Sequence, residues 1–333
     1  MNTPEEFREI ANTLAVMGYL ADGEHFAIAR LSGGVSCDVY RVTLSDRSVC
    51  VKRALPKLRV EADWFAPAER AATEVAWIKL VASIHASWVP KILGEDRAQH
   101  LFVMEFLPPE SHPVWKHELA AGHIDVAFAT EVGIALARIH AATAGRDDIA
   151  RQFDNAAQFH ALRLEPYLLF TADKHPDVAP HIRAIADGVA NARFALMQGD
   201  ISPKNILCGP KGPVFLDAET ACYGDPAFDL AFCLNHLLLK CVWHPQYAHD
   251  YLESLSALKR AYFKGVTWED PIALDKRAAG ILGALLLARI DGKSPVEYLT
   301  KESDKAAVRE KAKALLRRSD LVLREIAEGW LPI

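Results

Sequence analysis

Three oxygen-bearing side chains stand close together in the middle of the chain. Asp200 lies in the segment QGDISPKNIL, Asn205 follows five residues later, and Asp217 follows twelve residues after that, in the segment PVFLDAE. Burying carboxylate and amide groups without partners costs free energy, so such a cluster needs a ligand that compensates. Oxygen atoms of this kind are the ligands that magnesium prefers. The pattern therefore predicts a site for magnesium and nucleotide phosphates.

The segments around these residues support that interpretation. NILCG and PVFLDAE have the character of two short strands joined by a turn. A loop that carries Asp200 would hold a substrate hydroxyl, while Asn205 and Asp217, at the ends of the hairpin, would converge on the metal. The order D-x-x-x-x-N, strand, turn, strand, Asp is that of kinase-like phosphotransferases. A lone D-x-x-x-x-N is weak evidence, but the downstream L-D-x-E makes the pattern much stronger.

A glycine pair in the first lobe could approach nucleotide phosphates. The segment RLSGGVSCDVYRV predicts a turn between two strands. Gly33 and Gly34 would let the backbone approach phosphate oxygens. Ser32 and Ser36 flank the pair and would add hydrogen-bond donors. Alone, such a pair is more often an ordinary hairpin turn, and only its place before the next strand favours a phosphate loop.

The next strand and helix supply a lysine and a glutamate. VCVKRA places Lys52 on the third strand, where it would contact the α and β phosphates. Glu74 lies on the following helix and would pair with Lys52. Glu69 is a competing partner, but Glu74 is favoured because it falls inside the apolar periodic segment. Adenine would contact the connection after the last strand, mainly through backbone groups, at Met104, Glu105 and Phe106.

The apolar pattern predicts an α+β protein with two lobes, residues 1–107 and 108–333. In the first lobe, a capping box opens a helix from Thr3 to about Leu20, FAIARL, CDVYRVTL, SVCVKRA and QHLFVMEFL predict an antiparallel sheet, and 66–85 has helical spacing. The second lobe is mainly helical apart from the hairpin. We expect its helices at 126–144, 181–196 and 228–242, and a polar surface connection at 145–158.

Composition narrows the functional class. The 333 residues are 51% hydrophobic and 24% charged, as in ordinary globular proteins, and a net charge of −5 gives no basic field to attract nucleic acid or an anionic membrane. Six cysteines without a C-x-x-C pair predict reduced core thiols. The first residues do not resemble a signal peptide, and the most apolar segments are too short or too interrupted to span a bilayer. We expect a cytoplasmic protein, monomeric or homodimeric, that acts on a small molecule.

The segment MQGDISPKNILCGPKGPVFLDAETACYGDPAFDLA resembles the H-G-D-x-x-x-x-N, I-D-x-E and D-P-x-x-D-L-A motifs of the aminoglycoside phosphotransferase and choline kinase superfamily. These proteins are small-molecule kinases with a two-lobed, protein-kinase-like fold, and the resemblance covers nearly the whole chain. It implies that Asp200 is the catalytic aspartate, that Asn205 and Asp217 bind magnesium, and that Asp229 accepts hydrogen bonds from catalytic-loop amides. Gln198 stands where the family usually has histidine. It can make a comparable hydrogen bond but cannot become charged, so we interpret it as structural.

The D-A-E segment that starts at Asp217 replaces the D-F-G of protein kinases. Glu219 would supply a further metal oxygen, as in the methylthioribose kinase branch, which DAETACYGDPAFDLAFCLNHLLL also resembles. Only twelve residues separate Asp217 from Asp229, too few for an activation segment and a peptide-docking platform. We therefore do not expect a protein substrate. Asp225 is expected to be a turn residue and Lys204 a solvated lysine.

The predicted reaction is transfer of the γ-phosphoryl group of ATP to a substrate hydroxyl, with Mg²⁺ present. Asp200 would orient the hydroxyl, and Lys52 would neutralise phosphate charge. The acids and aromatic residues of the helical lobe would suit a hydroxylated metabolite, either cationic or neutral, such as an aminoglycoside, a choline-like amino alcohol or a methylthioribose-like sugar. Arg289 and Asp291 are candidates for substrate contact. The main alternative is a catalytically silent nucleotide-binding protein with the same fold. Acyl-CoA metabolism is a third, which no motif supports.

Overall fold

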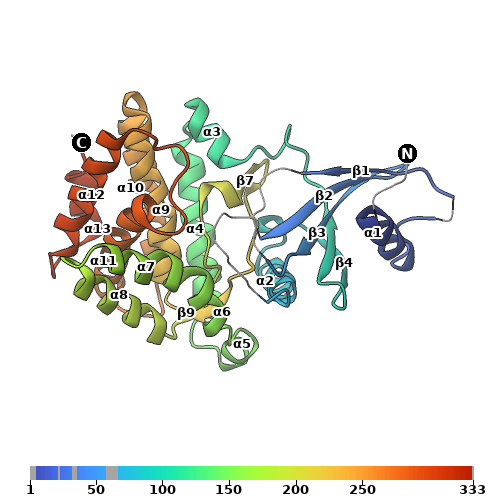
Figure 1. Cartoon of the computed structure of the whole chain (residues 1–333), viewed down its shortest axis with the longest axis horizontal. Helices are drawn as coiled ribbons and strands as arrows, with labels where there is room; N and C mark the ends of the chain where they lie inside the picture. Colours follow the sequence, from blue (N-terminus) through green and yellow to red (C-terminus); the bar gives the residue numbers. More distant parts are fainter. Residues whose placement is uncertain (1–4, 22, 32–35, 58–66, 332–333) are drawn as a thin grey trace. The chain divides into compact units, whose positions relative to one another are not determined.

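The computed structural model describes residues 5–21, 23–31, 36–57 and 67–331. The chain divides into two compact units, Met1–Pro108 and Pro109–Ile333, within one residue of the division expected from the sequence. Each unit is described by itself (Figure 1). The predicted capping residues Thr3 and Pro4 lie outside the described residues.

The first unit contains a five-stranded antiparallel sheet in the order β1-β2-β3-β5-β4. Its strands are β1 (Ala27–Arg30), β2 (Cys37–Thr43), β3 (Ser48–Ala54), β4 (Ile92–Asp96) and β5 (Leu101–Glu105), and its helices are α1 (Glu5–Val16), α2 (Arg70–Ile84) and the 3₁₀ turn η1 (Ala86–Trp88). The sequence did not predict β4. Its segment ILGED contains a glycine at a register shift, and it lacks the alternation that marks a half-buried strand.

Alternation along β3 sends neighbouring side chains to opposite faces of the sheet. Val49 and Val51 pack with Ile10 and Leu14 of α1 in one hydrophobic core. Because Lys52 follows Val51 directly, its side chain faces the opposite side. The sheet thereby holds the lysine away from the α1 core.

The second unit is mainly helical, as predicted (Figure 1). Its longer helices are α3 (Trp115–Ala121), α4 (Val126–Thr143), α8 (Ala179–Asn191), α9 (Pro226–Trp243), α10 (Ala248–Lys264), α11 (Pro271–Asp291) and α12 (Glu302–Leu316). Shorter helical pieces are α5 (Asp147–Gln152), α6 (Ala156–Phe159), the π-helical η2 (His160–Leu169), α7 (Phe170–Lys174), η3 (Pro203–Asn205), η4 (Pro245–Tyr247) and α13 (Leu323–Glu328). The strands are β6 (Ala195–Met197), β7 (Ile206–Gly209), β8 (Gly212–Phe215) and β9 (Cys222–Gly224).

The predicted hairpin is confirmed, because β7 pairs with β8 in antiparallel register. Two other expectations for this unit were wrong. The segment 145–158 is not only a surface connection, because it forms α5 and buries Ile149 and Phe153. The helix expected at 181–196 ends at Asn191, and its last residues enter β6, which pairs with β9. A three-residue strand is too short to show a periodicity in sequence.

The centre of the second unit is α9, which packs against α10 and α11. Every residue of α9 from Pro226 to Val242 is buried, including the polar Asp229, Asn235, His236 and Lys240. The neighbouring α4 packs against α10. By length and composition alone α4 could cross a membrane, but core helices of soluble proteins pass the same test, and more than half of it is buried inside this unit.

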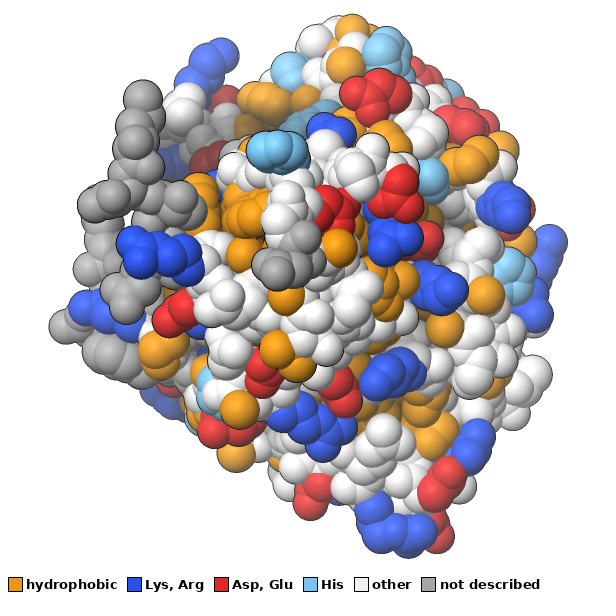
Figure 2. All heavy atoms as spheres, turned by 90° about the vertical axis from the view of Figure 1, so that its right-hand side faces the viewer, with side chains coloured by type: hydrophobic (Ala, Val, Ile, Leu, Met, Phe, Trp, Pro, Cys, Tyr) orange, Lys and Arg blue, Asp and Glu red, His pale blue; other side chains and the backbone are white. Residues whose placement is uncertain are grey.

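The cysteines and the surface agree with the composition. All six cysteines are free, and five are buried. Burial, the largest effect, raises the pKa of the Cys50 thiol to about 12, so this thiol stays protonated at neutral pH. On the face shown in Figure 2, acidic and basic side chains lie interspersed.

The contact between α4 and α10 depends on Gly133. A Cβ atom at this position would overlap the backbone carbonyl oxygen of Leu258 on α10. We predict that Gly133→Ala lowers the free energy of unfolding by about 2 kcal/mol, because backbone cannot yield as a flexible side chain can. Urea unfolding would measure this. Gly188→Ala on α8 is the control: it meets nothing within 4 Å, and removing a helical glycine there should be neutral or stabilising.

Candidate active site

In the first unit, Lys52 of β3 pairs with Glu74 of α2. The Lys52 Nζ atom lies 2.8 Å from Glu74 Oε1 and 2.7 Å from Oε2, and both side chains are buried, with exposures of 7% and 3%. Glu74 is therefore the partner of Lys52, as predicted. The pair holds the ammonium at one place on the sheet face.

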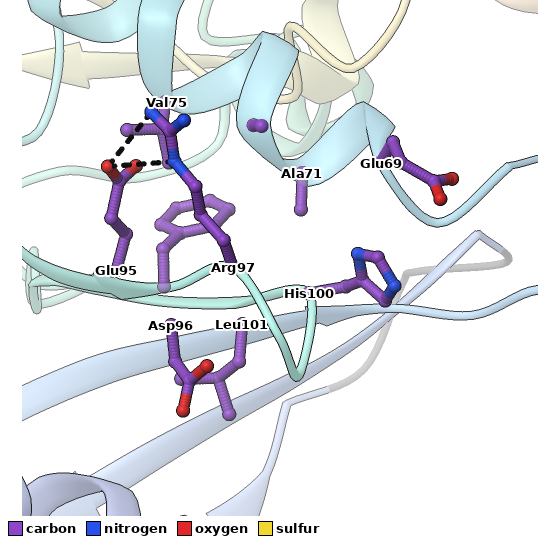
Figure 3. A pocket seen from close by; sticks show the side chains of 10 residues that line it. Glu69, Ala71, Val75, Glu95, Asp96, Arg97, His100 and Leu101 are labelled. Carbon is purple, nitrogen blue, oxygen red and sulfur yellow. Dashed lines mark hydrogen bonds and ion pairs between the residues drawn. The ribbon is translucent and has the colours of Figure 1, made fainter.

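The competing glutamate, Glu69, lies elsewhere. It is exposed at the start of α2, at the edge of a hollow of about 150 Å³ between α2 and the β4–β5 hairpin. Figure 3 shows Glu69 at one end of this hollow and the ion pair between Glu95 and Arg97 at the other. The position of Glu69 before the first residue of α2 explains why it does not reach Lys52.

The remaining nucleotide candidates of this unit are only partly described. Ser32, Gly33 and Gly34 lie outside the described residues. Ser36 is buried, and its carbonyl oxygen accepts hydrogen bonds from the backbone of Leu55 and from the fully buried side chain of Arg70. Ser36 is thus tied into the sheet, and its contact with phosphate stays a prediction.

The predicted adenine segment ends β5. Met104 is buried, and the Glu105 carboxylate accepts a hydrogen bond of 2.9 Å from the backbone amide of Lys91. The Arg41 guanidinium lies 4.6 Å from the centre of the Phe106 ring. The Glu105 side chain is thus engaged within the protein, and adenine contact through the backbone of this segment stays a prediction.

In the second unit, the two carboxylate oxygens of Asp200 differ. Oδ2 accepts from Asn205 Nδ2 at 2.8 Å and forms ion pairs with Arg163 at 3.0 Å and Lys204 at 3.1 Å. Oδ1 is buried and has no hydrogen-bond partner among the residues that the structure describes. One oxygen is therefore saturated, and the other is left for a ligand.

Asn205 is oriented by the same contacts. Its Nδ2 atom also donates to the Asp200 carbonyl oxygen at 3.1 Å. Because the amide nitrogen is used in this way, the amide oxygen is the atom left to bind a metal. This is the donor that magnesium requires.

Gln198 joins the catalytic loop to the loop of Asp217. Its side-chain oxygen accepts from the Asp200 amide at 2.6 Å, and its Nε2 atom donates to the carbonyl oxygens of Leu216 and Asp217 at 2.7 and 3.1 Å. A glutamine has the one acceptor and the two donor hydrogens that these contacts use. The structure thus agrees with the structural role inferred from the sequence.

Asp217 has an unusual backbone conformation. Its φ of 66° lies in the left-handed region, which non-glycine residues seldom adopt. Such strain persists where surrounding contacts fix it and is concentrated at functional sites. Next to it, Glu219 is buried with 5% exposure, and its carbonyl oxygen accepts from Gln158.

The Asp229 carboxylate accepts hydrogen bonds from the loop that leads to Asp200, as the sequence predicted. Its Oδ2 and Oδ1 atoms accept from the backbone amides of Gln198 and Gly199, each at 2.7 Å. His140 Nε2 lies 3.3 Å from Asp229 Oδ2, and His140 Nδ1 lies 2.9 Å from the Tyr262 hydroxyl. The side chains of Asp229, His140 and Tyr262 are all fully buried.

Sequence analysis missed Arg163, which lies on η2. Its side chain donates to the Gly199 carbonyl oxygen at 2.6 Å and pairs with Asp200. Burial alone would lower the pKa of Arg163, but Asp200, Tyr167, Glu219 and Asp217 raise it on balance. The carboxylates of Asp200, Glu219 and Asp217 thus all act electrostatically on one guanidinium, and Asp200 contacts it directly. Pro166 interrupts the regular pattern of this segment, so its helical spacing gave no signal.

Three further candidates from the sequence have partners within the second unit. Asp225 caps α9 and pairs with Arg277 at 2.8 Å, so it is a structural turn residue, as expected. Lys204 was expected to be solvated and is half-exposed, but it also reaches Asp200. Arg289 is buried and contacts the Tyr167 hydroxyl at 3.4 Å.

The Asp291 carboxylate belongs to another network. It accepts from Arg309 Nε at 2.6 Å and lies 2.9 Å from His175 Nε2. The two residues that the sequence grouped as substrate candidates, Arg289 and Asp291, therefore have different surroundings. A role for Asp291 in substrate contact stays a prediction.

The model of the phosphotransferase enzyme family matches residues 27–264, which is more than half of the chain and includes Lys52, Asp200 and Asp217. This chain belongs to the phosphotransferase enzyme family. The same span includes Glu74, Asn205 and Asp229. The family assignment thus agrees with the resemblance seen in the sequence, and it supports a kinase-type enzyme.

Solved structures show the fold of this phosphotransferase. A choline kinase from Cryptosporidium parvum Iowa II aligns with a TM-score of 0.58 and 12% identity over 97% of this chain and 100% of the other. An ethanolamine kinase from Plasmodium vivax gives 0.57 and 12% over 94% and 90%, and the ADP-bound aminoglycoside phosphotransferase APH(2'')-Ib gives 0.51 and 13% over 94% and 99%. At this identity the likeness establishes the protein-kinase-like fold alone. A comparison with curated proteins finds no match.

A second buried histidine of this phosphotransferase, His236 on α9, is electrostatically destabilised in its charged form. Burial, together with the positive charges of Arg289, Lys240 and Lys204, lowers its pKa well below the usual value. The folded protein therefore binds this proton less readily than the unfolded chain does.

We predict that His236 makes stability fall with acidity. Its contribution is present above the unfolded pKa of about 6.5 and is lost as the pH falls below it, because the unfolded chain then takes up a proton that the folded state refuses. Between pH 7 and pH 5.5, wild type should lose about 1 kcal/mol more unfolding free energy than His236→Gln. Urea unfolding at both values measures this. The exposed His249→Gln serves as the control, and an equal loss in all three proteins would contradict the prediction.

Proposed function

We propose that this phosphotransferase transfers the γ-phosphoryl group of ATP to a hydroxyl of a small molecule, using Mg²⁺. The proposal rests on the different surroundings of the two carboxylate oxygens of Asp200. Its Oδ2 atom is held by Asn205, Arg163 and Lys204, while the buried Oδ1 atom has no partner among the described residues. A substrate hydroxyl would satisfy Oδ1, and the contacts on Oδ2 would fix its direction.

The reaction follows from this arrangement. The acceptor oxygen forms a bond to the γ-phosphorus while the bond between that phosphorus and the bridging oxygen of ADP breaks. The hydroxyl proton passes to Asp200, late in the reaction, because a loose transition state does not need a strong base. Arg163 and Lys204 are compatible with that role, since they stabilise the carboxylate as an orienting group more than as a base.

The donor set fits a divalent cation. Asn205 presents its amide oxygen, Asp217 presents a carboxylate from a fixed left-handed backbone, and Glu219 is a third oxygen donor two residues on. Magnesium bound by such oxygens would neutralise charge on the nucleotide phosphates. In the first unit, the Lys52–Glu74 pair holds an ammonium in place, and a lysine of this kind contacts nucleotide phosphates in kinase-like proteins.

The silent nucleotide-binding alternative is disfavoured by the same residues. A protein that only bound nucleotide would not need a buried carboxylate with one oxygen kept for a further ligand. It would bind ATP without releasing ADP in an acceptor-dependent way. Acceptor-dependent ADP release therefore separates the two functions.

We predict that Asp200→Asn lowers kcat for ADP release at least 100-fold. The loss corresponds to about 3 kcal/mol of transition-state stabilisation, as for other groups that act only in the transition state. Release is measured with MgATP and a panel of hydroxylated compounds. The dissociation constant for MgATP should change less than threefold, and the exposed Asp187→Asn on α8 should behave as wild type. Undiminished turnover in Asp200→Asn would exclude this mechanism.

A matched pair of substitutions on α2 tests the nucleotide side. Glu74→Gln should lower kcat/KM for MgATP at least tenfold, because Lys52 loses the anion that positions it. Glu69→Gln, five residues earlier and exposed, should stay within twofold of wild type. Steady-state ADP release at varied MgATP gives both values. Equal effects of the two substitutions would mean that the ion pair has no part in catalysis.

A further inference from the structure

Two buried cations of the second unit have no carboxylate within ion-pair distance among the residues that the structure describes. Lys240 on α9 is 1% exposed, and its Nζ atom makes no hydrogen bond or ion pair with any described residue. Arg289 on α11 is 7% exposed, and its Nε atom likewise has no partner, while Nη1 donates to Ser294 and Tyr167. A buried charge without a counter-ion is costly, so this arrangement calls for an anion from outside the chain.

Lys240 lies between two aromatic rings. Its Nζ atom is 4.9 Å from the ring centres of both Trp243 and Tyr298. The pKa of Lys240 is lowered to about 8. Burial is the largest cause, Lys116 also lowers it, and Glu297 acts in the opposite direction. The face of an aromatic ring attracts a cation more weakly than a carboxylate or a phosphate does. The aromatic pair that could hold a positively charged substrate is thus occupied by the ammonium of the chain itself.

A series of contacts connects Arg289 with Asp200, and the charges of Arg289 and Lys240 both lower the pKa of the buried His236. The guanidinium carbons of Arg163 and Arg289 lie 5.7 and 5.6 Å from the centre of the same Tyr167 ring, and Arg163 contacts Asp200 directly. The Tyr167 ring lies 5.6 Å from the Phe232 ring, which lies 5.7 Å from the His236 ring. We refer to Arg163, Lys204, Arg289 and Lys240 as the cation cluster.

Three carboxylates near the cluster already form ion pairs, and Asp217 and Glu219 act electrostatically on Arg163. Asp200 pairs with both Arg163 and Lys204, Glu297 pairs with Lys116, and Glu165 pairs with Lys293. In the part of the chain that the structure describes, no carboxylate lies within ion-pair distance of Arg289 or Lys240. The low pKa of His236, which burial and these cations produce, is a further sign of a positive region.

We propose that the phosphate acceptor is a hydroxylated compound with an anionic group, a carboxylate or a phosphate ester, which Arg289 and Lys240 bind while its hydroxyl lies at Asp200. The inference rests on the proposed function, since it places the acceptor hydroxyl at Asp200. It differs from the aminoglycosides and choline-like amino alcohols that are among the acceptors compatible with the sequence. Such compounds would bring a further positive charge to two cations that have no carboxylate within ion-pair distance among the described residues.

The first experiment compares acceptors that differ mainly in charge. ADP release is measured with D-glycerate and glycerol 3-phosphate, with neutral glycerol, and with ethanolamine and choline. We expect KM for an anionic acceptor to be at least tenfold lower than for the neutral or cationic ones. A lower KM for ethanolamine or choline would overturn the inference and leave the proposed function intact.

The second experiment removes one charge. Lys240→Met should raise KM for the anionic acceptor at least tenfold with kcat changed less than threefold, and Lys276→Met, exposed on α11, should have no effect. Lys240→Met should also be at least as stable as wild type, because a buried charge without a partner is removed. A KM unchanged by Lys240→Met would overturn the inference.

A binding measurement makes the test independent of turnover. Inorganic phosphate and glycerol 3-phosphate should raise the thermal unfolding midpoint of wild type and of Lys276→Met, and should raise that of Lys240→Met clearly less. Equal shifts in all three proteins, or no shift in wild type, would refute anion binding at Lys240. By contrast, ADP release that survives Asp200→Asn would refute the proposed function, so the two failures are distinguishable.

Discussion

The two hydrogen bonds from backbone amides to the buried Asp229 carboxylate determine the geometry of the candidate site. A carboxylate with no solvent contact must be satisfied by the protein, and Asp229 is satisfied by the amides of Gln198 and Gly199 and by His140. These contacts fix the backbone directly before Asp200. Gly199 adopts a φ of 82°, and a Cβ there would lie 2.6 Å from the Thr220 hydroxyl, so glycine is required at this position.

Once this backbone is fixed, the functional side chains follow from it through short contacts. Gln198 joins the Asp200 amide to the carbonyl oxygen of Asp217, so the loops that carry Asp200 and Asp217 cannot shift independently. Asn205 Nδ2 then donates to one carboxylate oxygen of Asp200, and this contact does not use the amide oxygen of Asn205, the proposed metal ligand. Each contact occupies a donor or acceptor atom of one residue and thereby orients the next residue in the series. The spacing of these residues in the sequence follows from these contacts.

The residues with local signals were predictable. The D-x-x-x-x-N segment and the downstream aspartate flank a short hairpin, and Lys52 and Glu74 lie on a regular strand and helix. Periodicity indicated these elements, and the order of kinase-like motifs indicated the pairing of Lys52 with Glu74. Arg163 and β4 could not be predicted in this way. Arg163 lies on a π-helical turn that contains a proline, and β4 has a register shift, so neither follows a regular period. Their positions depend on tertiary contacts that one sequence does not display.

Substrate charge is the property that the sequence left most open. The acids and aromatic residues of the helical unit are compatible with a cationic or a neutral substrate, because composition does not show which acids are already paired. Asp200 is held by two cations, whereas Arg289 and Lys240 are held by no carboxylate among the described residues. The aromatic rings of Trp243 and Tyr298 face a lysine of the same chain. The charge that remains unpaired after folding, and not the composition, therefore indicates the charge of the ligand.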